Sequence, residues 1–254
     1  LLDQVQALCC RLFQAVRADL LLLAFLHDRE LSRETLETLR EDCCEDFFGL
    51  QLRNAEARAA FKLFRQGLDD IPADLGGGTL DILAAEYADI YLNHSVRASP
   101  CESVWTDEDG LAMQDAMFQV RKWYRLHGLA VEDWRMRPDD HLVTQLQFAG
   151  YLLEAGLGLE RLEETARFLD EHLLRWIGAF GDRVSARCRT RFYAGLARIT
   201  SAYLDEFREL AAEILDSPRP SAEEVEARMR SRKAADGVEV AAPAPFVAGS
   251  GPSW

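Results

Sequence analysis

The stretch DDHLVTQLQFAGYLLE, residues 139–154, decides the fold class of this chain. Its apolar residues recur every three or four positions and therefore share one stripe on a helix of about 3.6 residues per turn. These residues are Leu142, Leu146, Ala149, Leu152 and Leu153. The same spacing recurs along most of the chain, and no segment alternates apolar and polar residues over several periods. The sequence therefore predicts an all-α protein of about ten helices.

Residues with strong end preferences divide this pattern into separate helices. Ser32 precedes a helix predicted over 33–41, because its hydroxyl can accept a hydrogen bond from a first-turn amide. Gly128 follows a helix predicted over 109–127, since glycine readily adopts the left-handed conformation that ends helices. Further helices are predicted over 79–93, 139–154, 160–180 and 187–215.

Composition divides the chain into one domain and a tail. Residues 1–216 are predicted to form a single helical domain, with the irregular loop 94–107 as its candidate hinge. Two prolines open the tail, 217–254, which is first charged and then rich in Pro, Ala and Gly. Its charged part, 223–233, is compatible with a loosely attached helix. The remainder has too little periodic apolar content to offset the entropy of ordering, so the tail is predicted to be flexible and disordered.

The charge balance of the chain excludes some partners. It has 43 Asp and Glu against 29 Lys and Arg, a formal net charge of -14 at pH 7. Such a surface repels a phosphate backbone, so no nucleic-acid partner is expected, whereas a basic peptide would be attracted at low ionic strength. The longest apolar run, 20–26, is too short to span a bilayer, and no signal sequence precedes it. The sequence therefore predicts a cytoplasmic protein without membrane insertion.

The residue spacings of common metal, nucleotide and catalytic sites do not occur. The six cysteines include two vicinal pairs and lack the C-x₂-C spacing of zinc and iron–sulfur sites, so they are predicted to be reduced thiols. None of the five histidines has a carboxylate three positions before it, as di-iron helix bundles require. A phosphate-binding glycine loop is also missing. We therefore predict a protein that is not an enzyme and holds no metal or cofactor.

The most suggestive polar cluster is PDDH, residues 138–141. Proline at the first position of a helix and Asp in its first turn are what an ordinary helix start prefers, so capping alone can explain the cluster. A catalytic Asp140–His141 dyad is disfavoured, because successive helical residues point about 100° apart. Most of the nearby aromatic residues are expected to pack inside, whereas Trp105, in a loop beside Pro100, is a candidate for a recognition surface.

Five short motifs occur in order between residues 17 and 215. They are YADIY at 87–91, SPCESVW at 99–105, PDDH at 138–141, FLDEHLLRW at 168–176 and FYAGLA at 192–197. In this order they resemble the Y-x-x-L-F, P-x-x-S-V-Y/W, P-x-D-H, H-L-x-x-W and F-Y-x-x-L-A motifs of the TorD/DmsD/NarJ family, the twin-arginine proofreading chaperones. Each motif is short, but their order and spacing make the resemblance specific. Two departures are Ile90-Tyr91 in place of Leu-Phe, and Cys101 where relatives often carry proline or an aromatic residue.

The resemblance implies an all-helical, non-catalytic chaperone of the cytoplasm with a TorD-like fold. Its partner would be the catalytic subunit of a molybdenum oxidoreductase, bound through its twin-arginine leader or as the apo-enzyme. Binding would support cofactor insertion and delay export until the enzyme matures. The resemblance assigns peptide recognition to eight residues, with Asp140 accepting a hydrogen bond from a leader arginine and the aromatic residues covering the apolar part. They are Tyr87, Ile90, Tyr91, Pro100, Ser103, Trp105, Asp140 and His141.

Two alternatives stay open. Like the nitrate-reductase branch of the family, the chain could be an assembly factor that binds the mature enzyme without reading a leader. It could also be a guanine-nucleotide-responsive switch, since family members have been linked with guanine nucleotides, although the phosphate-binding loop is missing. The identity of the client, and the choice between a monomer and a homodimer, do not follow from the sequence.

Overall fold

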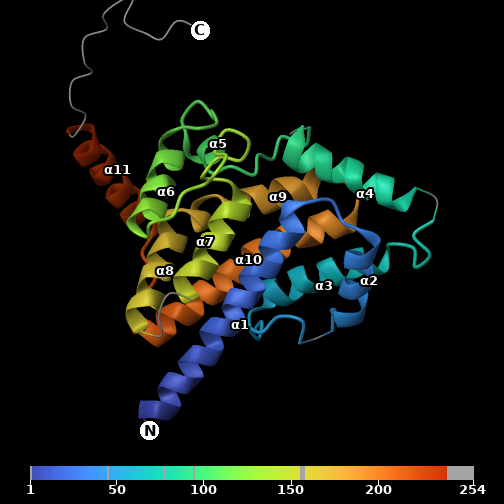
Figure 1. Ribbon diagram of the computed structural model, residues 1–254, viewed down its shortest axis with the longest axis horizontal. Coiled ribbons are helices and arrows are strands. Elements are labelled where there is room, and N and C mark those ends of the chain that lie inside the picture. The colour runs from blue at the N-terminus through green and yellow to red at the C-terminus, as the bar shows by residue number, and fades with distance from the viewer. Residues whose placement is uncertain (1, 45, 77, 94, 155–157, 239–254) are drawn as a thin grey trace, which may run out of the picture. The chain divides into compact units, whose positions relative to one another are not determined.

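The computed structural model describes residues 2–44, 46–76, 78–93, 95–154 and 158–238 (Figure 1). All regular elements in these ranges are helices, and one isolated antiparallel bridge joins Cys101 to His141. The predicted all-α class with about ten helices is confirmed. The α-helices are α1 (Leu2–Asp28), α2 (Arg33–Asp42), α3 (Ala55–Asp69), α4 (Thr79–Tyr87), α5 (Ser103–Thr106), α6 (Asp115–Leu126), α7 (Leu142–Glu154), α8 (Leu159–Glu171), α9 (Ile177–Arg187), α10 (Arg191–Leu215) and α11 (Ala222–Val238).

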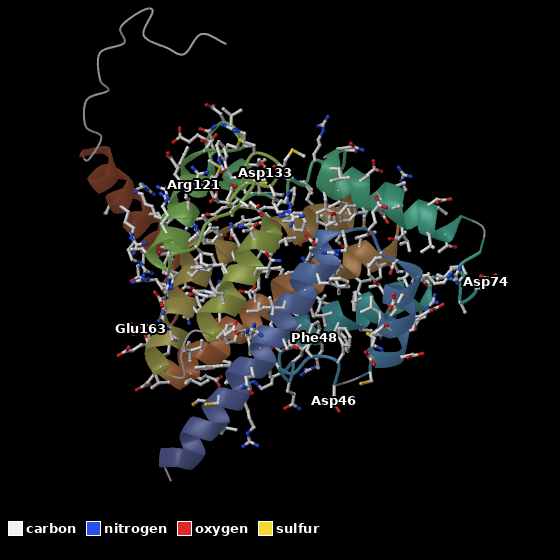
Figure 2. All side chains as sticks on the ribbon, viewed as in Figure 1. Asp46, Phe48, Asp74, Arg121, Asp133 and Glu163 are labelled. Atoms are coloured by element: carbon white, nitrogen blue, oxygen red, sulfur yellow. The ribbon has the colours of Figure 1, made fainter. Side chains whose placement is uncertain are left out.

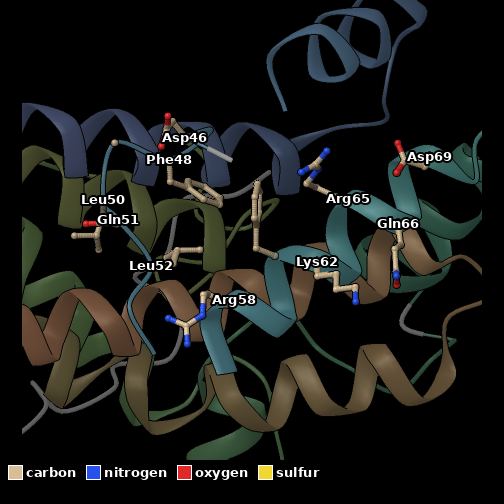
Figure 3. A pocket seen from close by; sticks show the side chains of 12 residues that line it. Asp46, Phe48, Leu50, Gln51, Leu52, Arg58, Lys62, Arg65, Gln66 and Asp69 are labelled. Carbon is tan, nitrogen blue, oxygen red and sulfur yellow. The ribbon is translucent and has the colours of Figure 1, made fainter. Parts of the chain in front are cut away.

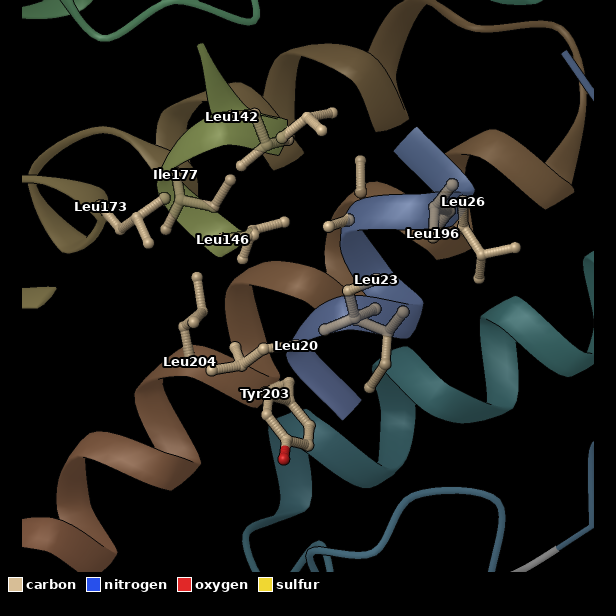
Figure 4. Packing of buried hydrophobic residues seen from close by; sticks show 14 of the residues in the cluster. Leu20, Leu23, Leu26, Leu142, Leu146, Leu173, Ile177, Leu196, Tyr203 and Leu204 are labelled. Atoms are coloured by element: carbon tan, nitrogen blue, oxygen red, sulfur yellow. The ribbon is translucent and has the colours of Figure 1, made fainter. Parts of the chain in front are cut away.

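Contacts within the chain divide it into two units, Leu1–Arg219 and Pro220–Trp254. In the first unit, α10 packs most extensively on α3 and also on α9 and α8, while α1 packs along α7 (Figure 1). Figure 4 shows leucines of α1, α7 and α10 meeting in the core of this unit. Each such side chain contributes about 1.5–3 kcal/mol when fully buried, so this core is the main source of stability for the helices around it.

Helices α3 and α10 touch backbone to backbone at two glycines. A methyl group on Gly195 would overlap the backbone of Phe64, and one on Gly67 would overlap the backbone of Phe192. Both helices also bury aromatic rings at this contact, where the rings of Phe64 and Phe192 have centroids 5.4 Å apart. Only residues without a Cβ allow these two helices to approach so closely.

Two predicted helix ends are confirmed. Ser32 is the N-cap of α2, because its hydroxyl accepts a hydrogen bond from the amide of Thr35 at 3.1 Å. Gly128 ends α6 with a positive φ of 69°. Its amide donates to the carbonyl of Arg125, and the next amide donates to that of Tyr124, so the last carbonyls of the helix are satisfied.

The helix predicted from residue 139 begins at Leu142. Three other predicted boundaries were wrong, and each lies at a side-chain interaction. The helix predicted over 109–127 begins at Asp115, since the Asp107 carboxylate binds the amides of Asp109 and Leu111, both at 3.1 Å, and holds a turn there. The helix predicted over 160–180 is broken after Glu171. A 3-10 turn, Leu173–Arg175, separates α8 from α9, because the ring of His172 turns toward Glu102.

The third boundary is the start of α10, predicted at residue 187 and found at Arg191. Glu86 of α4 accepts hydrogen bonds from the amides of Arg189 and Thr190, which lie directly before the helix. The carboxylate therefore satisfies amides at a helix start from a distant segment of the chain. The helix predicted over 79–93 is found as α4, continued by a π-helical turn over Ala88–Leu92.

The second unit contains α11, which lies inside the predicted tail. Ser221 and Glu224 form a reciprocal capping pair at its start, with amide-to-side-chain distances of 2.7 and 3.2 Å. The rest of the predicted tail, 239–254, lies outside the described residues, as does residue 94 of the predicted hinge loop.

No helix in the described ranges is long and apolar enough to cross a membrane. All six cysteines are free thiols. Among the residues that the structure describes, no group of three or more His, Cys, Asp or Glu side chains is arranged to hold a metal ion.

Candidate functional site

The loop before α5 is fastened to the start of α7 through Asp140. The Asp140 carboxylate accepts hydrogen bonds from the Ser103 amide at 2.8 Å and from the Ser103 hydroxyl at 2.5 Å. The Ser103 hydroxyl in turn accepts from the amide of Gln114 at 3.1 Å. Both Asp140 and Ser103 are 0% exposed. Asp140 therefore caps α5, and the Ser103 hydroxyl that it holds joins the start of α5 to the residue directly before α6.

Backbone hydrogen bonds reinforce this attachment. The Leu142 amide donates to the carbonyl of Pro100 at 2.7 Å, and the Glu102 amide donates to the carbonyl of Asp140 at 3.1 Å. His141 caps α7, because its Nδ1 accepts from the amide of Val143 at 3.2 Å. That contact requires an unprotonated Nδ1, so a neutral ring carries its proton on Nε2. We call this set of contacts, between 100–103 and 140–143, the loop clamp.

A buried carboxylate beside the loop clamp joins it to the break between α8 and α9. Glu102 is 0% exposed and accepts from Gln145 Nε2 at 2.8 Å, contacts His172 Nδ1 at 3.1 Å and pairs with Arg175 at 3.3 Å. Sequence analysis quoted Glu102 and His172 within motifs but gave them no role. Their signal was a polar, titratable side chain inside each motif, since a buried polar group requires hydrogen-bond partners.

Trp105, which was predicted to lie in a loop, lies in the short helix α5 and remains half-buried. Its indole nitrogen donates to the carbonyl of Ser99 at 2.8 Å. Its ring stacks on that of Trp176 with centroids 6.5 Å apart, and the guanidinium of Arg183 lies 4.7 Å above it. The motifs at 99–105, 138–141 and 168–176 thus meet at one place in the structure.

The three predicted residues of the 87–91 motif lie in a second cluster. Tyr87 donates to the carbonyl of Asp28 at 2.7 Å, Tyr91 contacts His27 at 2.5 Å, and Ile90 is fully buried. Rings join the two clusters, because Phe180 lies 6.4 Å from His27 and 6.5 Å from Trp105 by centroid. Phe180 therefore links the two clusters of predicted residues.

Of these eight, Trp105 and His141 are half-buried and the other six are buried. Pro100, Ser103, Trp105, Asp140 and His141 are brought together at the loop clamp, whereas Tyr87, Ile90 and Tyr91 are anchored to the end of α1. In this arrangement most of the predicted residues are buried and have a structural role beneath the surface of the protein.

Electrostatics at the loop clamp do not favour a reactive group. Burial raises the pKa of the Asp140 carboxyl, and hydrogen bonds from Ser103 oppose the rise. Burial also raises the pKa of the Cys101 thiol, so the nucleophilic thiolate is disfavoured. The Ser103 hydroxyl donates to Asp140 and is inaccessible to a substrate. The geometry suits holding a loop rather than catalysis.

Four exposed apolar side chains that sequence analysis did not single out lie at the start of α6, in the loop before it and in the segment before the clamp. Leu111, Met113, Phe118 and Met136 are between 38% and 83% exposed, and we call them the α6 surface. Met113 and Phe118 occupy the N′ and N4 positions of α6, whose side chains neighbour one another at a helix start. Sequence analysis missed these residues because it predicted a helix over 109–127, whereas residues 109–114 form a loop before α6.

Charged side chains connect and flank the α6 surface. Arg121 lies on α6 (Figure 2). Its guanidinium lies 5.4 Å from the ring centroid of Phe118 and 4.8 Å from that of Trp134, and pairs with Asp139 at 2.8 Å. Arg121 thus joins this surface to the residue before Asp140. Exposed acidic residues lie on the loop before α6 and on the segment before the clamp: Glu108, Asp109, Glu132 and Asp133.

Residues 50–182, just over half of the chain, match the family model described as nitrate reductase delta subunit. The chain belongs to this family. The predicted membership of the TorD/DmsD/NarJ group is confirmed by the same match and by its relatives. All the residues of the loop clamp lie inside the matched range.

Relatives of this chain carry chaperone names. A Chaperone protein TorD of Vibrio cholerae serotype O1 is 30% identical over 52% of this chain and 64% of its own length. A Chaperone protein TorD of Vibrio vulnificus is 26% identical over 71% of this chain and 87% of its own. A Tat proofreading chaperone DmsD of Salmonella paratyphi A is 27% identical over 45% and 54%. The chain thus spans slightly less than two thirds of the Vibrio cholerae relative.

Proposed function

We propose that this chain is a non-catalytic cytoplasmic chaperone that binds the twin-arginine leader of a molybdenum-cofactor oxidoreductase subunit. Binding would support cofactor insertion and delay export until the enzyme is mature. The family and the names of the relatives, two TorD chaperones and a Tat proofreading chaperone, support this proposal.

The observation that carries the proposal is the α6 surface. A twin-arginine leader combines a basic segment with an apolar segment. The α6 surface combines exposed Phe118 and Met136 with nearby carboxylates, on a chain whose formal net charge is -14. Apolar contact would supply affinity and opposite charge would steer the peptide to the surface.

Within this proposal the eight predicted residues have two kinds of role. Trp105 and His141 are accessible enough to contact a peptide, while the buried pair Ser103 and Asp140 positions α5, which carries Trp105. Acceptance of a leader arginine by Asp140 stays a prediction. It would require the carboxylate to exchange its contacts with Ser103 for contacts with the guanidinium.

Calorimetric titration with a synthetic leader peptide tests the proposal. We expect Phe118→Ser to weaken leader binding by about ten-fold or more, because a buried aromatic contact would be lost. Ile82→Ser is the matched control, since Ile82 is 53% exposed on α4 while Phe118 is 50% exposed. Equal affinity of the two variants for the leader would contradict the proposal.

Asp140→Asn, measured in the same titration, separates its two roles. If Asp140 receives a leader arginine, loss of a charge-assisted hydrogen bond of roughly 1.5–3 kcal/mol should weaken binding by about ten- to a hundred-fold. We expect this result, with a smaller defect in His141→Gln. A lower melting temperature with unchanged affinity would instead confine Asp140 to holding the loop.

A second candidate is an assembly factor that binds the enzyme body without reading a leader. The description of the matching family as a nitrate reductase subunit favours it. Binding to a leaderless apo-enzyme, with no heat of binding for the leader peptide, would support this candidate over the first.

A further inference from the structure

A groove on the first unit lies between the segment 46–52 and helix α3, away from the residues of the loop clamp (Figure 3). Its volume is about 820 Å³. Phe48, Leu50, Leu52 and Phe61 supply its apolar lining. A groove of this size and character is typical of a binding site.

Contacts with α1 hold the segment 46–52, which forms one wall of the groove, in place. Asp19 of α1 accepts hydrogen bonds from the amides of Gly49 at 2.9 Å and Leu50 at 3.0 Å, and from the hydroxyl of Tyr203 at 2.7 Å. Gly49 also sits so close to α1 that a methyl group there would lie 2.7 Å from the Cβ of Ala15. The groove is therefore preformed, which reduces the entropy lost when a ligand binds.

Cationic side chains line the opposite wall. Arg58, Lys62 and Arg65 are spaced four and three residues apart on α3 and so share one face of the helix. None of them forms an ion pair with a carboxylate in the described part of the chain, whereas Arg53, just before α3, pairs with Glu206 and Glu213. Two carboxylates, Asp46 and Asp69, also line the groove.

We propose that this groove binds an acidic, apolar peptide segment of a partner protein. Carboxylates of the segment would pair with Arg58 and Lys62, while its apolar side chains would cover Phe48 and Phe61. From Arg58 to Asp69 the wall extends for about 16 Å, which accommodates about five residues of an extended peptide. The cations of α3 disfavour a basic leader beside Arg58 and Lys62, so the groove and the α6 surface take different ligands, and this inference does not depend on the proposed function.

The test uses capped hexapeptides in which leucine alternates with aspartate, asparagine or lysine, titrated into the full chain and followed by nuclear magnetic resonance. We expect the aspartate peptide to bind, to shift amide signals of residues 46–69, and to bind at least about ten-fold more tightly than the other two. Equal binding of the three peptides, or no binding of the aspartate peptide, would overturn the proposal.

Charge reversal localises the site. The double variant Arg58→Glu, Lys62→Glu should weaken binding of the aspartate peptide by about ten-fold or more. The control, Arg11→Glu with Arg125→Glu, makes the same change in net charge at exposed positions outside the groove lining and should change affinity by less than about two-fold. Equal losses in both variants would refute a site in the groove. If the reversed variant fails to fold, Arg58→Gln with Lys62→Gln removes the charges alone and decides the same question.

Discussion

His27 shows how strongly burial acts on one side chain. Its ring is fully buried at the end of α1, with Nδ1 2.5 Å from the Tyr91 hydroxyl and Nε2 2.8 Å from the Thr200 hydroxyl. Burial lowers the pKa of His27 to about 3. The ring is therefore neutral near physiological pH, and each of its nitrogens contacts a hydroxyl.

This pKa predicts acid sensitivity. His27 has a folded pKa of about 3 against an ordinary value of 6.5, so the unfolded chain binds the proton more readily between those values. The unfolding free energy should therefore fall as the pH drops below 6.5, by up to about 1.4 kcal/mol per pH unit from this group. We expect His27→Gln to be less stable at neutral pH but to lose stability less steeply toward acid. Urea titrations at a series of pH values measure the slope, and equal slopes for both proteins would contradict the assignment.

Helices α3 and α10 depend on each other through glycine. Their contact places Gly195 against the backbone of Phe64, where neither side can move without shifting a helix. Gly150 of α7 differs, because a methyl group there would meet only the side chain of Leu21 at 3.6 Å and that of Arg17 at 3.8 Å. The two glycines therefore have opposite tolerances.

We expect Gly195→Ala to lower the unfolding free energy by about 3 kcal/mol or more, since overpacking against backbone cannot be relieved by a rotamer change. Gly150→Ala should be neutral or stabilising by up to about 1 kcal/mol, because alanine is the better helix former. Chemical denaturation of both variants measures the difference. Similar stabilities would show that the α3–α10 contact can widen without penalty.

The two units of the chain differ in the apolar content that can stabilise them. The first contains the large core around α10, whereas the second begins with α11 and its capping pair and continues into Pro-, Ala- and Gly-rich sequence. Sequence of that composition buries little apolar surface on folding.

Removing residues 239–254 should therefore leave the body of the protein intact. We expect the melting temperature to change by less than about 2 °C, which corresponds to less than about 1 kcal/mol for a protein of this size. Calorimetry of the chain with and without these residues compares the two directly. A decrease of several degrees would show that these residues stabilise the folded protein.

Local rules predicted much of the fold and part of the candidate site. The helical class followed from the spacing of apolar residues such as Leu142 and Leu146, and the helix ends at Ser32 and Gly128 followed from capping preferences. These rules succeed because a capping bond or a helical stripe involves residues only a few positions apart. The order of the motifs also placed the chain in its family.

The tertiary structure alone decided which polar groups meet. Asp140 caps a helix that starts 37 residues earlier, Glu102 contacts His172 across 70 residues, and Glu86 binds the start of α10 across 103. Each of these buried carboxylates needs hydrogen-bond donors, and the packing of the helices determines which donors are within reach. The sequence therefore determined the helices and the family, while tertiary packing determined which predicted residues are buried beneath the surface and which remain exposed on it.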